Sequence, residues 1–276
     1  MSVDVLRVID PRGYFNSFFT KGIYPDGRAL LDVQKLVYKQ GECGGVGSSV
    51  VTTHGTTVSC TIEASVSLES DGQLVSVEIG QSQQISEKDS DEYSSLILSL
   101  FSRELFIKRE ALKCRDSSGN KLPLDWLLTV SLKVLSCESN ILDAIICAVT
   151  SALKDTKLPS IVLKHSIEDE SAIEKSQILI DHSTSKLDVL DVLMCCSFGV
   201  FVKNPEDIEQ KEILLLTPSE EIASVCKATC SVIVGKDNKI VMLRERGKLN
   251  SFHYLKKMVQ ITSERQRRFA ETLEKS

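Results

Sequence analysis

The sequence has no apolar run that approaches 18 residues, and its first residues alternate apolar side chains with Asp4, Arg7, Asp10 and Arg12. A helix that crosses a bilayer needs about 20 mostly apolar residues, and a signal peptide needs an apolar central region. The sequence therefore predicts neither a membrane span nor a cleaved leader. An excess of positive charge is also missing, because the net charge is −5. Any contact with nucleic acid must then come from a local group of basic residues.

Spacing typical of metal ligands is absent as well. The nine cysteines include no CxxC pair, and none of the four histidines lies at ligand spacing from another. The cysteines are odd in number and lie mostly inside apolar runs, which indicates buried, reduced thiols and suits a cytosolic or nuclear compartment. Cys226 and Cys230 are four residues apart without a second pair, so they make a weak zinc site. We expect no metal and no cofactor.

The clearest pattern is the alternation of apolar and polar residues over 58–66, which is typical of a strand with one buried face. A second strand-forming run covers 48–53, and His54-Gly55 between the two predicts a hairpin turn. The glycine-rich segment 41–47 is followed by a strand rather than a helix, so it is not a dinucleotide-binding loop. The hairpin needs a helix or a sheet to cover its apolar face.

Helical spacing marks three further segments of the chain. Aromatic residues four apart predict a short helix over 14–19, and a second helix follows the polar segment 81–91, which we expect to be a loop. Residues 140–154 are apolar around nearly the whole circumference and begin with Asn140, a good N-cap. A helix of this kind is buried between layers. Expected strands in this half cover 31–39, 73–79 and 124–137.

The second half repeats the order of strands followed by a helix. Strands are expected over 161–164, 189–202, 213–216, 225–234 and 239–243, and a long helix over 252–273. Thr262 interrupts the apolar stripe of this helix, whereas Arg265, Arg267 and Arg268 lie on its polar side. We expect one domain over 1–276, with halves of about 25–158 and 159–276 and an N-terminal helical extension over 1–24.

Several motifs in fixed order resemble one known family. They are Tyr14, the turn Tyr24-Pro25-Asp26-Gly27-Arg28, the hairpin segment Gly55-Thr56-Thr57-Val58, the helix start Asn140-Ile141-Leu142-Asp143-Ala144 and the helix end Lys157-Leu158-Pro159. Together they resemble the RNase PH-like ring subunits of the eukaryotic RNA exosome core, in the non-catalytic lineage. The resemblance spans roughly residues 8 to 270.

The resemblance implies an α+β, RNase PH-like fold with two pseudo-symmetric, strand-rich halves and helices packed between and outside them. It also implies partners, because such subunits pair and three pairs close a ring around a channel for single-stranded RNA. Cap subunits with RNA-binding domains would cover the ring. The locations implied are nucleus, nucleolus and cytoplasm.

The same resemblance predicts that catalysis is lost. Active members open the helix at Asn140 with Gly-Thr-Arg, which binds phosphate, and here Ile141 and Leu142 occupy the Thr and Arg positions. A second arginine of active members falls near Ser99, although Arg103 is close. The catalytic carboxylates fall on Thr217 and Ala223, while Glu220 and Glu221 remain nearby. The alternative is an active phosphate-dependent 3′–5′ exoribonuclease that uses Arg103 and the two glutamates.

Basic residues that could contact RNA phosphates form two groups in the sequence. They are Arg103, Lys108 and Arg109 in the first half, and Arg244, Arg246 and Lys248 in the second. Contacts of this kind depend on salt. Each group could instead be a solvated rim, and the chain could be an assembly module that does not contact RNA.

Overall fold

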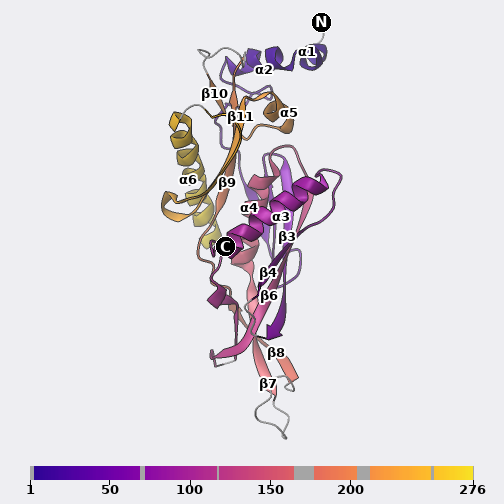
Figure 1. Cartoon of the computed structure of the whole chain (residues 1–276), viewed down its shortest axis with the longest axis vertical. Helices are drawn as coiled ribbons and strands as arrows, with labels where there is room; N and C mark the ends of the chain where they lie inside the picture. Colours follow the sequence, from indigo (N-terminus) through magenta and orange to yellow (C-terminus); the bar gives the residue numbers. More distant parts are fainter. Residues whose placement is uncertain are drawn as a thin grey trace.

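Two antiparallel-rich sheets and a separate two-stranded ribbon follow one another along the long axis of the molecule (Figure 1). The computed structural model describes residues 3–68, 72–116, 118–164, 177–203, 212–249 and 252–275. The first sheet has the order β1-β2-β3-β6-β4, with β5 also paired to β6. Its strands are β1 (Val37–Gln40), β2 (Gly47–Thr53), β3 (Thr56–Leu68), β4 (Val75–Ile79), β5 (Lys113–Arg115) and β6 (Lys121–Ser136).

The second sheet has the order β10-β9-β11-β12, and the ribbon consists of β7 and β8. The bounds are β7 (Lys157–Lys164), β8 (Gln177–Lys186), β9 (Met194–Phe201), β10 (Ile213–Leu216), β11 (Ala228–Val234) and β12 (Ile240–Gly247). The second sheet lies at the upper end in Figure 1, near the N-terminal helices, and the ribbon lies at the opposite end.

Six helices and two short 3-10 turns complete the described part of the chain. They are α1 (Val3–Ile9), α2 (Pro11–Phe19), α3 (Glu87–Ser102), α4 (Ile141–Asp155), α5 (Glu220–Val225), α6 (Phe252–Glu274), η1 (Arg109–Leu112) and η3 (Lys236–Asn238). Among the described residues, none of these helices has both the length and the apolar content that a bilayer crossing requires.

The predicted hairpin is confirmed and forms the middle of the first sheet. Strands β2 and β3 pair from Thr53 opposite Thr56 back to Gly47 opposite Ile62. At the turn, His54 has φ 51° and Gly55 has φ 73°. Two central residues with positive φ match the right-handed twist of the flanking strands, which is why such turns close tight hairpins. On the apolar face of β3, Val58, Cys60 and Ile62 are fully buried and Ala64 and Val66 are partly buried against the core, as the alternation predicts.

Helix α4 lies between the two sheets, as the sequence predicts. The Asn140 side chain accepts a hydrogen bond from the backbone N–H of Leu142 at 3.0 Å and so caps the helix. All residues from 141 to 153 are buried. On one side Ser49 of β2 donates to the carbonyl of Ala148 at 2.7 Å, and on the other Thr150 donates to the carbonyl of Leu193, just before β9, at 3.2 Å. The helix therefore joins the two halves into one core.

The turn at 24–28 fastens the N-terminal segment to the second sheet. The Tyr24 hydroxyl donates to the carbonyl of Leu216 at 2.8 Å, and the Arg28 guanidinium lies over the Tyr24 ring, 3.9 Å from its centroid. Arg28 also donates to the carbonyl of Thr217 at 3.2 Å. A motif that the sequence shows only as a turn thus holds the end of β10.

Several of the predicted elements have wrong bounds or types. The strand expected over 161–164 is longer, β7 at 157–164, and the strand expected over 239–243 is β12 at 240–247. The expected strand over 31–39 is β1 at 37–40, and the expected strand over 189–202 is β9 at 194–201. The expected strand over 225–234 divides into the end of α5 and β11. Within the expected loop over 81–91, α3 already begins at Glu87, because Ser86 caps it by accepting from the backbone N–H of Asp89 at 3.1 Å. Acidic residues in a first turn also favour a helix through its dipole.

Arg265 is the clearest error of the sequence interpretation. It was expected on the solvated side of the last helix, but its exposed fraction is 5%. Its guanidinium donates to Thr53 Oγ1 at 3.2 Å and to Cys196 Sγ at 3.3 Å. Helix α6 packs against β9 and β11 and brings this side chain over the junction between the two sheets. The buried Thr262 is satisfied locally, since it donates to the carbonyl of Met258 at 2.8 Å.

Candidate functional site

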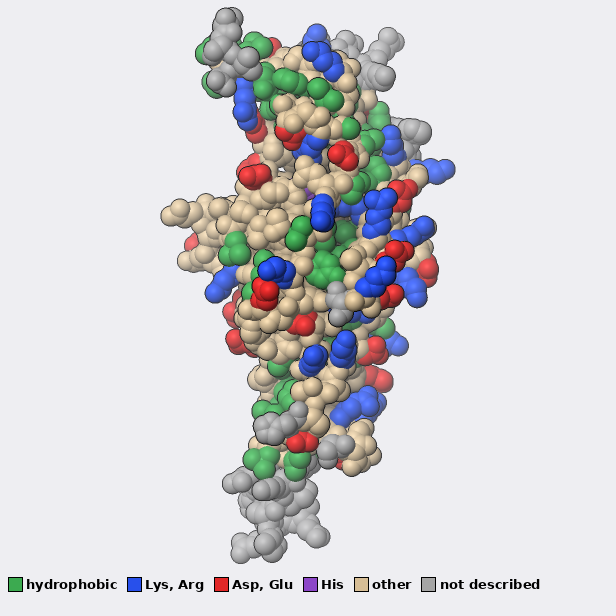
Figure 2. All heavy atoms as spheres, turned by 180° about the vertical axis from the view of Figure 1, so that it is seen from behind, with side chains coloured by type: hydrophobic (Ala, Val, Ile, Leu, Met, Phe, Trp, Pro, Cys, Tyr) green, Lys and Arg blue, Asp and Glu red, His purple; other side chains and the backbone are tan. Residues whose placement is uncertain are grey.

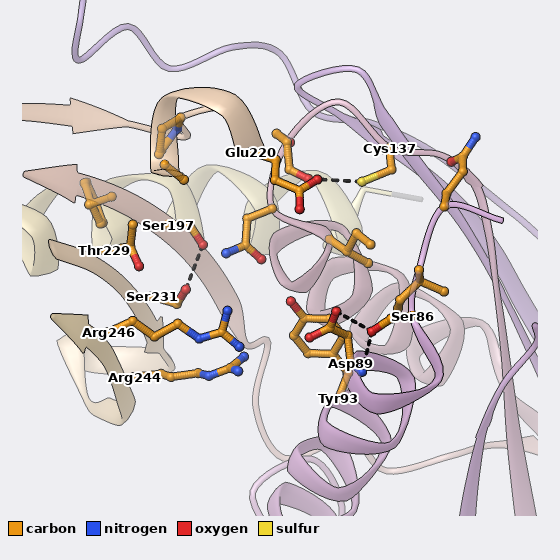
Figure 3. A pocket seen from close by; sticks show the side chains of 18 of the residues that line it. Ser86, Asp89, Tyr93, Cys137, Ser197, Glu220, Thr229, Ser231, Arg244 and Arg246 are labelled. Atoms are coloured by element: carbon orange, nitrogen blue, oxygen red, sulfur yellow. Dashed lines mark hydrogen bonds between the residues drawn. The ribbon is translucent and has the colours of Figure 1, made fainter. Parts of the chain in front are cut away.

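A cavity of about 460 Å³ opens between α3, the start of α4 and the second sheet (Figure 3). Its lining is mostly polar. Residues that face it include Ser86, Asp89 and Tyr93 of α3, Asn140 and Ile141 at the start of α4, Ser197 of β9, Thr229 and Ser231 of β11, Glu220 and Ala223 of α5, and Arg244 and Arg246 of β12. The cavity therefore joins residues from both halves of the chain.

The start of α4 is tied to the second sheet by a buried carboxylate. Asp143 accepts from the backbone N–H of Ser197 at 3.0 Å and from its hydroxyl at 2.7 Å. Ser197 and Ser231 then share a hydrogen bond of 2.9 Å. Burial raises the pKa of Asp143, while the hydrogen bond from Ser197 and the charge of Arg265 oppose that shift. The positive end of the helix dipole is thus already matched by Asn140 and Asp143.

Two arginines from β12 lie at the edge of the cavity and share one carboxylate. Arg244 and Arg246 are two residues apart, so they project from the same face of the strand. Both form ion pairs with Glu92 of α3, with a distance of 3.2 Å for the Arg246 pair. The Arg244 guanidinium lies 5.4 Å from the centroid of the Tyr93 ring, and burial raises the pKa of that tyrosine. The two guanidinium groups and Glu92 together carry a formal charge of +1, while the carboxylates of Asp89 and Glu220 also line the cavity.

This edge has the chemistry of an anion site. Guanidinium groups bind phosphate oxygens in a fork geometry, and the hydroxyl of Thr229 adds a neutral donor in the cavity, whereas the Ser197 and Ser231 hydroxyls are already used in the hydrogen bonds to Asp143 and to each other. Arg246 is the more accessible of the pair, with 62% of its side chain exposed. The cavity contains no second cationic cluster among the described residues that line it.

The structure brings some of the predicted residues together and separates others. Arg244, Arg246 and Ile141 line the same cavity, although they are about 100 residues apart in the sequence. Leu142 is fully buried in the core. The remaining basic residues do not line the cavity: Arg103, Lys108, Arg109 and Lys248.

The first basic group lies toward the far end of α3. Arg103 follows the last residue of this 16-residue helix, which is about 24 Å long at about 1.5 Å per residue. Lys108 and Arg109 are at the 3-10 turn η1, where Arg109 donates to the carbonyl of Gly72 at 3.2 Å. Lys248 is exposed just beyond β12. Their contact with RNA stays a prediction.

The positions at which active members carry catalytic carboxylates make other contacts in this chain. Thr217 is buried and held by Arg28 through its carbonyl. Ala223 and Glu220 face the cavity from α5, whereas Glu221 forms an ion pair with Arg7 of α1. That hydrogen bond from Arg7 lowers the pKa of Glu221. The two glutamates begin the short helix α5, which Ser219 caps by accepting from the backbone N–H of Ile222 at 3.4 Å.

Sequence reasoning missed Glu92, Tyr93, Ser197 and Ser231 as parts of this site. Tyr93 was assigned only to the apolar stripe of its helix, and Glu92 had no distinguishing neighbour. A usable signal existed for the serines, since each interrupts an otherwise apolar strand, and they lie opposite one another in the β9–β11 register. Within the described part of the chain, no three His, Cys, Asp or Glu side chains gather as metal ligands; His165 lies outside that part.

Comparison with known proteins identifies the fold. Residues 37–159 match the model of the 3′ exoribonuclease family, domain 1, named RNase PH. A chain of an archaeal exosome core is similar with a TM-score of 0.67 and 19% identity, over 99% of this chain and 97% of that chain. A chain of the Archaeoglobus fulgidus exosome with RNA bound to the active site has a TM-score of 0.70 and 18% identity, over 98% of each chain. Rrp46 of rice (Oryza sativa) has a TM-score of 0.59 and 11% identity, over 90% of this chain and 97% of that chain.

The chain therefore has an RNase PH-like fold, and two of the solved structures that it resembles are exosomes. The fold class that the sequence resemblance implied is confirmed: a mixed α and β structure with strand-rich sheets and helices between and outside them.

Proposed function

We propose that this protein is a non-catalytic structural subunit of an RNA exosome core ring, which holds neighbouring subunits and helps to guide single-stranded RNA during 3′–5′ processing and decay. The observation that carries the proposal is the start of α4. Where active members of the fold carry a phosphate-binding pair, Ile141 faces the cavity as an aliphatic side chain and Leu142 is buried in the core.

Phosphorolysis requires an inorganic phosphate dianion held beside the scissile bond by cationic groups and N–H donors. Neither Ile141 nor Leu142 can donate a hydrogen bond. The carboxylate of Asp143 one residue further on repels an anion at the helix start. With Thr217 and Ala223 at the positions of the acidic residues, neither the phosphate nor the leaving group has its partner.

The guiding role rests on Arg244 and Arg246. Phosphates of single-stranded RNA bind through Lys and Arg contacts that carry no sequence information, which suits a subunit that passes RNA onward. Here two guanidinium groups share one paired carboxylate, Glu92, although the whole chain carries −5. The Tyr93 ring is buried beneath Arg244, so it is not exposed for base stacking. Arg244 and Arg246 would therefore act on RNA phosphates.

The partners proposed are other RNase PH-like subunits in a hetero-oligomeric ring, cap subunits with RNA-binding domains, and single-stranded RNA. Nucleus, nucleolus and cytoplasm are the proposed locations. The nine free cysteines suit a reducing compartment.

One observation favours the alternative of an active phosphate-dependent 3′–5′ exoribonuclease. Glu220 faces the same cavity as Arg244 and Arg246, so a carboxylate and two cations surround one space. Arg103, which also supported this alternative, lies outside the lining of that space.

The deciding experiment is phosphorolysis of single-stranded RNA labelled at its 5′ end, with inorganic phosphate, by the chain alone and in its native assembly. We expect the chain alone to release no nucleoside diphosphate. Glu221 is paired with Arg7, so Glu221→Gln is the control. Release of nucleoside diphosphate that Glu220→Gln abolishes and Glu221→Gln retains would show that the protein is an enzyme.

The guiding role is measured separately by fluorescence anisotropy of a labelled oligoribonucleotide at several salt concentrations. The double variant Arg244→Ala/Arg246→Ala is expected to bind more weakly for every sequence. The slope of log affinity against log salt should fall by about 1.4, since each lost phosphate contact removes about 0.7 for a single strand. Arg268→Ala on the exposed side of α6 is the matched control. An unchanged slope in the double variant would favour an assembly module that does not contact RNA here.

A further inference from the structure

The ribbon of β7 and β8 is the part of the structure that neither the cavity nor the core explains. Within the described part of the chain its strands pair only with each other, from Lys157 opposite Lys186 to Lys164 opposite Gln177. Near its base, Leu158 and Ile161 are buried in the core. Beyond this base it extends from the end of the molecule opposite the N-terminal helices (Figure 1).

Both faces of the ribbon carry exposed apolar side chains. Val162 and Leu179 are opposite each other in the register and share one face, while Ile180 lies on the other face opposite Ile161. Val162, Ile178, Leu179 and Ile180 are all exposed, and Ile180 has an exposed fraction of 66%. Figure 2 shows hydrophobic side chains at the surface of this narrow end.

A ribbon of this kind is incomplete by itself. Two isolated strands are only marginally stable in water and need a third strand or another layer to cover their apolar side chains. Within the described residues each strand also has one edge of backbone N–H and C=O groups without a strand partner. Such an edge with apolar neighbours is a template for pairing with another chain.

The charge of the ribbon indicates what kind of surface covers it. Residues 157–164 and 177–186 contain three lysines and one aspartate, a net charge of +2 with His182 neutral, whereas the whole chain carries −5. Lys154, Lys157 and Lys186 line one hollow at the base, together with Asp155 and Glu274. The Asp155 carboxylate accepts a hydrogen bond from the backbone N–H of Ser48 at 3.0 Å. Among the described residues, no ion pair involves these three lysines.

We propose that this ribbon inserts against a neighbouring subunit of the same fold, on a strand edge whose apolar centre is bordered by acidic side chains. Two ribbons facing each other would place lysines against lysines, so the geometry favours a different surface over ribbon-to-ribbon pairing of two copies. The inference rests on the proposed ring function, and it names the segment of this chain that makes one of the ring contacts.

The test uses the full chain co-expressed with RNase PH-fold subunits of its own organism, and compares Ile180→Asp with two controls. Ile180→Val keeps an apolar side chain at the same place, and Ile240→Asp introduces the same charge at an exposed isoleucine (49%) on the edge strand of the second sheet. Circular dichroism of each variant checks that it folds. We expect Ile180→Asp to weaken assembly at least about tenfold, as the loss of one large buried apolar side chain implies, and both controls to assemble like the wild type.

Hydrogen exchange supplies an independent readout. Peptides from 157–164 and 177–186 should exchange several-fold more slowly in the assembly than in the isolated chain, and this protection should vanish in Ile180→Asp. Assembly that tolerates Ile180→Asp, equal losses in Ile180→Asp and Ile240→Asp, or unprotected ribbon amides would overturn the inference while the ring function stands. Absence of any assembly with RNase PH-fold subunits would overturn both, as would a homodimer that buries the ribbon and excludes those subunits.

Discussion

Replacing Arg265 by methionine should destabilise this protein more than any other change of a charged residue on α6. The guanidinium is buried and supplies hydrogen bonds to Thr53 and Cys196. Its charge also opposes the rise in the pKa of buried Asp143. Methionine is an apolar side chain of similar length, but it carries no charge. The Asp143 carboxylate would therefore remain in the core without the nearby cation of Arg265.

Removing a charged donor from two buried acceptors costs about 3–5 kcal/mol, because a hydrogen bond to a charged group contributes about 1.5–3 kcal/mol and the bond to sulfur less. Domains are typically stable by about 5–15 kcal/mol, so the loss is a large fraction of the total. At about 2–4 °C per kcal/mol for chains of roughly this size, the melting temperature should fall by about 6–20 °C.

The variant should also change the dependence of stability on pH. The folded pKa of Asp143 is raised above its unfolded value of about 3.9, so the folded state binds the proton more tightly. Stability therefore falls as the pH rises from about 3.9 through the folded pKa. Without Arg265 that pKa rises further, and the penalty at pH 7 grows. The difference between wild type and variant should shrink when the pH is lowered from 7 to 5.

Thermal and urea unfolding of the purified protein at pH 7 and pH 5, followed by circular dichroism, measures both effects. Arg268→Met, on the exposed side of the same helix, is the control and should change stability by less than about 0.5 kcal/mol. A variant Arg265→Met as stable as the wild type at pH 7, or a deficit that does not shrink at pH 5, would refute the electrostatic link between α6 and the start of α4.

Three further outcomes follow from the fold. Ile145→Asp places a charge in the fully buried helix between the two sheets and should prevent soluble expression, and normal folding of this variant would show that α4 is not central. Gly55→Ala should cost about 1 kcal/mol in urea unfolding, because φ is 73° and the new Cβ would meet the Glu138 side chain, and an unchanged midpoint would contradict the turn geometry. The isolated chain should self-associate in light scattering and become monodisperse when co-expressed with an RNase PH-like partner, with total buried area above about 2,000 Å²; a stable monomer that binds no such partner would contradict the ring function.

Local pattern determined those parts of the fold in which one face of an element meets the core. The alternation over 58–66 requires a strand with one buried face, and His54-Gly55 requires a tight turn, so the hairpin could be predicted from the sequence. The apolar circumference of 140–154 likewise requires a helix between layers, and the structure buries it there. In each case the preference is set within a few residues, by side-chain period and by backbone conformation.

Element ends were predicted less well, because competing local signals decide them. The acidic residues before Tyr93 are typical of a polar loop and equally typical of a helix first turn, and only the Ser86 cap distinguishes the two. The strand expected over 225–234 failed for a related reason. A short helix capped by Ser219 ends at Val225, and Val225 and Cys226 are separated from the apolar residues of β11 only by Lys227.

The tertiary structure alone decided which distant side chains meet. Arg244 and Glu92 are 152 residues apart and form one ion pair only because β12 and α3 border the same cavity. Arg265 has the sequence environment of a solvated helix face, yet the junction of two sheets covers it and Asp143 lies buried nearby. Periodicity shows that a residue lies on the polar side of its own helix, but burial depends on what else packs there. That information is in the arrangement of elements far apart in the chain, which local patterns do not contain.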